Sequence, residues 1–89
     1  MGKVVLKIKV MPKDISTDIK EIAEKAKAFL TSRGSVYKVE IEPLAFGLNV
    51  VMITLVIDES EGSSKLESEF QDFKEAEMSI VDVSRMPDF

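Results

Sequence analysis

The sequence contains no cysteine and no histidine. Without cysteine the chain cannot form a disulfide or a thiolate metal site, and without histidine it lacks the commonest metal ligand and acid–base group. We therefore expect no metal, no cofactor and no enzymatic activity. The absence of cysteine is also compatible with a reducing cytosol, and we expect a cytoplasmic protein.

Long apolar runs are absent as well. No stretch approaches the roughly 18 apolar residues that a membrane-spanning helix needs. The first residues lead straight into an alternation of apolar residues and lysines, which is unlike a signal peptide. Leu6 stands where a myristoylation motif requires serine or threonine. We expect the protein to have no contact with membranes.

Positive charge is in the minority. Lysine and arginine number 12 against 16 aspartates and glutamates, which gives a formal net charge of −4. Nucleic-acid binders depend on attraction to phosphates, so we expect no direct nucleic-acid partner. The hydrophobic fraction of 45% and the charged fraction of 31% are those of a folded globular protein. A chain of 89 residues favours one domain that spans residues 1–89.

The centre of the sequence reads as two strands joined by an apolar connector. Residues 37–42 alternate apolar and charged side chains, with Tyr37, Val39 and Ile41 on the apolar face, whereas residues 48–57 are almost wholly apolar, as in an inner strand. The connector contains Phe46, although turns usually recruit small polar residues. The residues alone leave open whether Phe46 packs under the sheet or is displayed.

Two further elements precede this hairpin. Residues 3–11 alternate apolar side chains with lysines and predict a strand that ends at Pro12. Residues 18–33 then change to a period of 3.6, which predicts an amphipathic helix. Several oxygens could cap its first turn, and Asp18 also has capping-box spacing with Glu21. The N-cap candidates are Asp14, Ser16, Thr17 and Asp18. Gly34 suits the left-handed position that often follows a helix.

Two elements follow the hairpin. Ser63 and Ser64 are two possible N-caps of a second, shorter helix, and Ser64 forms a capping box with Glu67. The apolar stripe of that helix consists of Leu66, Phe70 and Phe73. Residues 77–86 predict a last strand, whose buried face the pattern does not decide. Two pairs compete for it, Met78 with Ile80 and Val81 with Val83.

The order strand, helix, strand, strand, helix, strand predicts an α+β ferredoxin-like fold. In this fold a four-stranded antiparallel sheet carries both helices on one face, and the first and third strands are central. The other face would be bare and would mix apolar residues with lysines, which is typical of a surface that meets a partner. Its predicted members are Val5, Lys7, Lys9, Val50, Met52 and Val56.

The sequence lacks the residues that common functions of this fold require. RNA recognition by stacking needs aromatic side chains on the first and third strands, which have none. Carboxylates are numerous, but they fall on predicted turns and helix surfaces, so we interpret them as solvating groups rather than as an acid–base pair. The most prominent are Glu59, Glu61, Glu67, Glu69 and Asp72.

Four passages resemble the archaeal-type elongation factor 1-beta family, and the resemblance covers essentially the whole chain. They are the opening strand at 4–12, the connector at 42–48, the acidic turn at 57–63 and the end of the last strand at 81–85. The most specific of them is the connector, in which a proline, apolar and small residues, an aromatic, a glycine and another apolar residue follow one another.

The resemblance implies a guanine-nucleotide exchange domain. Such a domain docks on the GTPase elongation factor 1-alpha, distorts its magnesium and phosphate site and speeds GDP release without cleaving a bond. It also implies that the connector contacts the partner, which favours a displayed Phe46 and assigns partner binding to its neighbours as well. These neighbours are Pro43, Ala45, Gly47 and Leu48. We expect a monomer when the protein is free.

Two positions depart from eukaryotic relatives. Those relatives carry a penultimate lysine that reaches the magnesium site, whereas Asp88 stands here, and Arg85 is the nearest basic substitute. They also carry paired basic residues after the connector, where this chain has Asn49 and Val50. The departures favour a mechanism that levers the GTPase loops by shape.

Two other functions remain open on the sequence. The chain could be a ferredoxin-like regulatory domain that binds a small ligand or associates with itself through the bare sheet face. It could also bind RNA through the lysines of the first strand, in which case binding would depend strongly on salt.

Overall fold

The computed structural model describes residues 2–13, 18–44, 47–58, 63–74 and 76–85. The elements follow the predicted order, with a short 3₁₀ turn, η2, after the second helix. They are β1 (Lys3–Pro12), α1 (Ile19–Thr31), β2 (Ser35–Pro43), β3 (Asn49–Asp58), α2 (Ser63–Glu69), η2 (Phe70–Asp72) and β4 (Ala76–Arg85).

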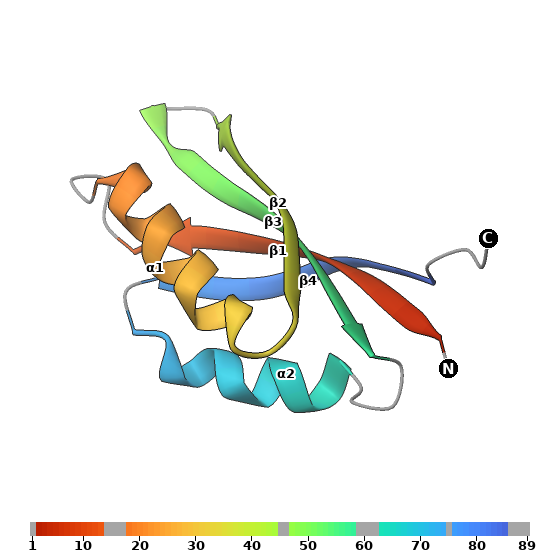
Figure 1. Ribbon diagram of the computed structural model, residues 1–89. Helices are drawn as coiled ribbons and strands as arrows, with labels where there is room; N and C mark the ends of the chain where they lie inside the picture. The colour runs from red at the N-terminus through yellow and green to blue at the C-terminus, as the bar shows by residue number, and fades with distance from the viewer. Residues whose placement is uncertain (1, 14–17, 45–46, 59–62, 75, 86–89) are drawn as a thin grey trace.

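The sheet has the order β2-β3-β1-β4, and all neighbouring strands are antiparallel. β1 and β3 are therefore central, as the sequence predicts. Both helices lie on the same side of the sheet (Figure 1). The ferredoxin-like α+β fold is confirmed, and it leaves the other side of the sheet without a helix layer.

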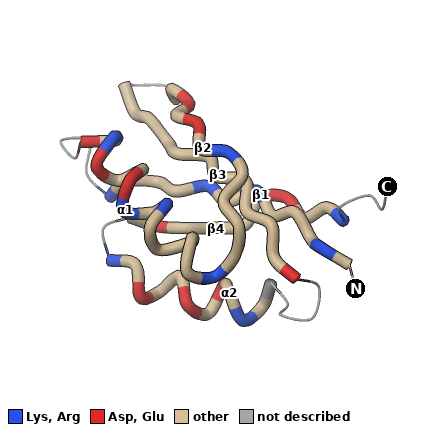
Figure 2. Tube along the Cα trace, viewed as in Figure 1, with Lys and Arg blue, Asp and Glu red and all other residues tan. Residues whose placement is uncertain are grey.

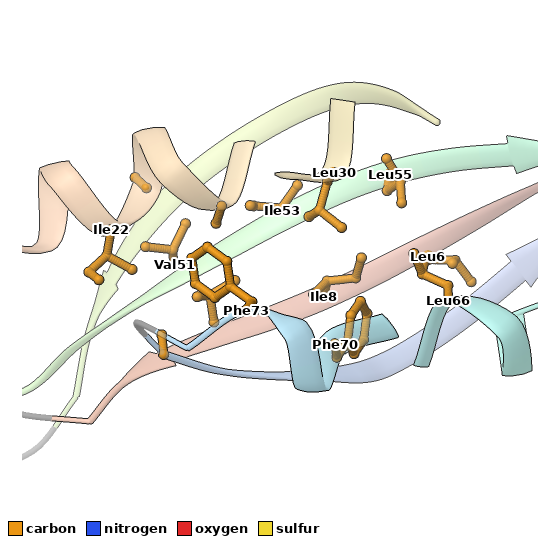
Figure 3. Close-up of a cluster of buried hydrophobic side chains, with 14 of the residues drawn as sticks. Leu6, Ile8, Ile22, Leu30, Val51, Ile53, Leu55, Leu66, Phe70 and Phe73 are labelled. Atoms are coloured by element: carbon orange, nitrogen blue, oxygen red, sulfur yellow. The ribbon is translucent and has the colours of Figure 1, made fainter. Parts of the chain in front are cut away.

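The hydrophobic core lies between the helices and the sheet (Figure 3). Alternate residues of β1 and β3 face it, and the predicted stripe of the second helical segment closes it from below. The sheet side is formed mainly by Leu6, Ile8, Val10, Val51, Ile53, Leu55 and Ile57, and the helix side by Ile22, Ala26, Leu30, Leu66, Phe70 and Phe73. Burial of these side chains is the main stabilising contribution, at roughly 25 cal/mol per Å² of apolar surface.

The two ends of α1 differ in how they match the prediction. Asp18 is the N-cap, since its carboxylate accepts a hydrogen bond of 3.0 Å from the N–H of Lys20. Gly34 does not adopt the predicted left-handed conformation, which among the described glycines occurs at Gly47. Gly34 is required for space instead, because a Cβ there would lie 2.8 Å from the carbonyl oxygen of Val56.

The second helix begins two residues earlier than the predicted capping box at Ser64 implies. α2 starts at Ser63, so Ser64 lies inside the helix and is not its N-cap. The predicted apolar stripe is nevertheless buried, because α2 passes directly into η2 and the turn keeps Phe70 and Phe73 against the sheet.

An arginine joins the two helical segments. The guanidinium of Arg33, just after α1, lies 3.8 Å from the ring centre of Phe29, and its Nε donates a hydrogen bond of 3.2 Å to Oε2 of Glu69. The Phe29 ring in turn meets Phe73 edge-on, with 5.5 Å between ring centres. A cation–π contact, an ion pair and an aromatic pair thus hold α1 against α2 and η2.

The predicted face of β2 is wrong at one position. The pairing register of β2 with β3 shifts between Val36 and Lys38, so Tyr37 sits at a bulge and is 65% exposed. Val36 and Val39 pack against the core instead. A bulge inserts one extra residue and exchanges the two faces of the strand beyond it, which the alternation of residues 37–42 cannot reveal.

The structure decides the face of β4. Met78 and Ile80 pack against the core. The register with β1 then shifts beyond Ile80, and Val81 and Val83 are 50% and 53% exposed. The first pair, Met78 with Ile80, is therefore the one that faces the core, and the second pair, Val81 with Val83, is exposed because a bulge shifts the register between the two halves of β4.

Candidate functional site

Backbone interactions hold together the two sides of the connection between β2 and β3. Pro43 pairs with Asn49 as the last rung of the ladder, and the N–H of Leu44 donates a hydrogen bond of 2.6 Å to the carbonyl oxygen of Leu48. Gly47 has a φ of +74°, a left-handed value that glycine adopts without steric cost. The two flanks of the connector are therefore held together at the end of the hairpin.

These flanks expose apolar surface. Leu44 is 40% exposed, and Ile41, near the end of β2, is 42% exposed. Pro43 is exposed and Leu48 is half-buried. The described flanks of the connector therefore expose two large apolar side chains near one end of the hairpin.

The two remaining site residues predicted in the connector, Ala45 and Phe46, lie outside the described residues. The sequence leaves open whether the side chain of Phe46 is buried or displayed, and both alternatives stand.

Arg85 lies far from the connector. It pairs with Val4, which pairs with Ile57, whereas the connector begins beyond the pair of Pro43 with Asn49. The two rungs are eight residue steps apart along β3, from Asn49 to Ile57, which is about 26 Å at roughly 3.3 Å per residue. Figure 1 shows the end of β4 and the β2–β3 connection at opposite ends of the sheet. The structure thus brings the connector residues together but leaves Arg85 apart.

The open face of the sheet exposes less apolar surface than predicted. The register places the predicted apolar residues there together with the lysines of β1. Val50 and Val56, however, are only 2% and 3% exposed. Val5 and Met52, the other two predicted apolar members, are half-buried. The apolar surface on this face is therefore smaller than predicted.

Lysine, arginine, aspartate and glutamate residues are spread over both strands and helices (Figure 2). Of the prominent carboxylates, Glu69 is engaged by Arg33, Glu67 and Asp72 are exposed, and Glu59 and Glu61 lie outside the described residues. Among the residues that the structure describes, no three acidic side chains gather in a way that could hold a metal ion. Within the same residues, no helix is long and apolar enough to cross a membrane.

Sequence reasoning missed two features. The contact of Arg33 with Phe29 and Glu69 joins residues far apart in the chain. A groove along the first half of β4 is formed by β1, α2, η2 and β4 together. No local pattern signals either of them, because each depends on how separate elements pack.

Comparisons with known proteins agree on one family. The model of the EF-1 guanine nucleotide exchange domain matches residues 5–87. An elongation factor 1-beta of Methanosarcina barkeri is 35% identical over 89 residues, which cover 97% of this chain and 100% of that protein. The protein of the same name in Methanosarcina acetivorans is 39% identical over 66 residues (73% and 74% of the two chains), and that in Archaeoglobus fulgidus is 37% identical over 62 residues (70% of each).

Proposed function

The chain belongs to the EF-1 guanine nucleotide exchange domain family of archaeal-type elongation factor 1-beta, and from this premise we propose that it promotes GDP release from the GTPase elongation factor 1-alpha. It acts in the cytoplasm during polypeptide elongation, is a monomer when free, and binds neither nucleic acid nor membrane. It catalyses no bond cleavage or formation of its own.

The docking site of this proposal is the connector between β2 and β3, with Phe46 as its anchor. The single observation that carries it is the exposed apolar side chain of Leu44 at a hairpin end whose backbone is closed by the hydrogen bond to Leu48. Pro43, Ala45, Gly47 and Leu48 complete the contact, and the ladder behind them supplies a rigid support.

The exchange reaction is a shift of populations. The factor must bind the nucleotide-free GTPase more tightly than the GDP-bound form, and each tenfold of preference requires about 1.4 kcal/mol of differential contact. A displayed aromatic side chain at the centre of an interface can supply about 2 kcal/mol or more. A standard interface of roughly 800 Å² per partner fits a molecule whose two longer dimensions are 42 and 25 Å.

The long separation between the connector and Arg85 supports action by shape. A partner that touched both would have to extend along the length of β3. In this proposal the connector anchors the GTPase, and Arg85 contacts it separately near the opposite end of the sheet. The domain then levers the magnesium and phosphate loops apart, with less direct competition by a cation than in eukaryotic relatives.

The test is stopped-flow release of a fluorescent GDP analogue from the cognate elongation factor 1-alpha, with and without this protein. We expect a release rate that rises with the concentration of the protein and then saturates. Leu44→Ser should weaken the effect, because it replaces exposed apolar surface by a hydroxyl. A release rate that does not change at saturating protein, with binding verified by sedimentation, would contradict the proposed function.

A further inference from the structure

A groove of about 510 Å³ follows the first half of β4. Its apolar lining includes Met78 together with Phe70 and Phe73, which are each 7% exposed. Three lysines from separate elements also line it, namely Lys9 in β1, Lys13 just after β1, and Lys74 between η2 and β4. The groove therefore combines an apolar lining with ammonium groups.

β4 is an edge strand, and its protection against pairing with another chain is uneven. The order β2-β3-β1-β4 gives it one neighbour in the sheet, β1. Its second half carries the bulge at Val81 and the charged Asp82, both of which discourage a further strand. The first half, residues 76–80, is regular and has one charged residue, Glu77. The groove lies beside this less protected half.

The register assigns each side chain of this half to a face. Met78 pairs with Val10 and faces the core side, as part of the apolar lining of the groove. Ser79 pairs with Lys9 on the open side of the sheet, and Glu77 points to that same side. A strand added along β4 would therefore meet an apolar strip on one face and alternating charges on the other.

We propose that the first half of β4 accepts an extended segment of another protein, as a fifth strand of the sheet. Its backbone would pair with residues 76–80, and its apolar side chains would cover the apolar lining that includes Phe70, Phe73 and Met78. This site is separate from the connector, because β4 and β2 are opposite edges of the sheet. A segment bound along residues 76–80 leaves uncovered both the connector and Arg85, which lies at the other end of β4.

The charges define which segment fits. A residue opposite Ser79 lies two strand spacings from Lys9, about 9.6 Å, and an acidic side chain can meet the lysine across the small serine. A residue opposite Glu77 should be basic. Read antiparallel to β4, the segment therefore has the pattern apolar, acidic, apolar, basic. Opposite charges on neighbouring strands stabilise such pairing, and like charges oppose it.

The unpaired lysines support an acidic residue in the segment. Within the part of the chain that the structure describes, Lys9, Lys13 and Lys74 take part in no ion pair. The groove also contains the carboxylates of Glu67 and Glu77, so the lysines exceed them by one. The segment is thus recognised by the order of its charges rather than by its net charge.

The experiment uses the full chain labelled with ¹⁵N and two synthetic peptides with blocked ends. One contains Val-Glu-Val-Lys and the other Val-Lys-Val-Lys in the same flanking residues. We expect the first peptide to shift the amide signals of residues 76–80 and their neighbours in β1 and η2, and to bind about threefold more tightly than the second. Equal affinities, or signal changes centred on another element, would overturn the proposal.

Two charge reversals on the same face of β1 form the matched control. Lys9→Glu should weaken binding of the first peptide about threefold, whereas Lys7→Glu should change it less, because Lys7 pairs with Asp82 beyond the bulge. Thermal unfolding checks that both variants fold. Equal affinity of the two variants contradicts the assigned register. Sedimentation that showed a dimer of the free chain through β4 would identify a second copy as the occupant and would also refute the proposal.

Discussion

The helix-covered core and the end of the β2–β3 hairpin contain the same residue types in opposite environments. Ile53 is fully buried under the helices, whereas Ile41 is 42% exposed. Leu30 is likewise buried in the core, whereas Leu44 is 40% exposed at the connector. Side-chain chemistry cannot separate these pairs. The position relative to the helix layer does, because side chains in the core beneath it are buried, whereas those at the hairpin end contact solvent.

The largest expected effect tests the isoleucine pair. Ile53→Ala removes three buried carbons beneath α1 and should lower the free energy of unfolding by about 3–4 kcal/mol. Ile41→Ala should lower it by about 1 kcal/mol, because much of its side chain already contacts water. Urea unfolding followed by circular dichroism measures both. Equal losses would show that the hairpin end belongs to the core.

The two structurally demanding glycines sharpen the comparison. Gly34→Ala places a methyl group 2.8 Å from the backbone oxygen of Val56 and should cost about 2–3 kcal/mol. Gly47→Ala meets no atom within 4 Å but keeps a φ of +74°, and should cost about 1 kcal/mol.

Substitution by asparagine distinguishes the steric requirement at Gly34 from the left-handed backbone requirement at Gly47. Gly47→Asn should recover most of the loss in unfolding free energy, since asparagine tolerates left-handed backbone, whereas Gly34→Asn should not. Recovery at both positions would argue against a steric role for Gly34.

A smaller effect concerns the ion pairs. Arg33 and Glu69 have side chains 25% and 33% exposed, and their ion pair is supported by the contact of Arg33 with Phe29. A double-mutant cycle with alanine should give a coupling of roughly 0.5–1 kcal/mol after screening by solvent. The pair of Lys38 with Glu40, at a similar 3.3 Å but 64% and 49% exposed, should couple by less than about 0.5 kcal/mol. Equal couplings would mean that the Arg33 contact adds nothing beyond a surface pair.

The fold could be predicted because each helix and strand has a recognisable local pattern of apolar residues. The alternation of β1, the apolar run of β3 and the 3.6 period of α1 each identify an element, and their order leaves few topologies. Tyr37 and Gly34 were misjudged because a bulge and a close approach to Val56 depend on neighbouring strands. The burial of Val50 likewise depends on the side chains across the sheet.

The candidate site could be predicted in part for the same reason. The apolar connector is a local feature, so its unusual composition stands out in the sequence. The separation of Arg85 from it follows from strand register and is invisible before pairing is known. The groove beside β4 was missed because Lys9, Phe70 and Met78 come from three different elements.

The most direct measurement compares two aromatic residues near opposite ends of the β2–β3 hairpin. Catalysed GDP release from elongation factor 1-alpha is recorded for Phe46→Ala and for Tyr37→Ala, whose parent side chain is 65% exposed at the β2 bulge. We predict that Phe46→Ala folds normally and slows catalysed release at least about tenfold, while Tyr37→Ala stays within about twofold of the unsubstituted protein. An unchanged rate for a folded Phe46→Ala, or unfolding of that variant, would contradict docking through the connector.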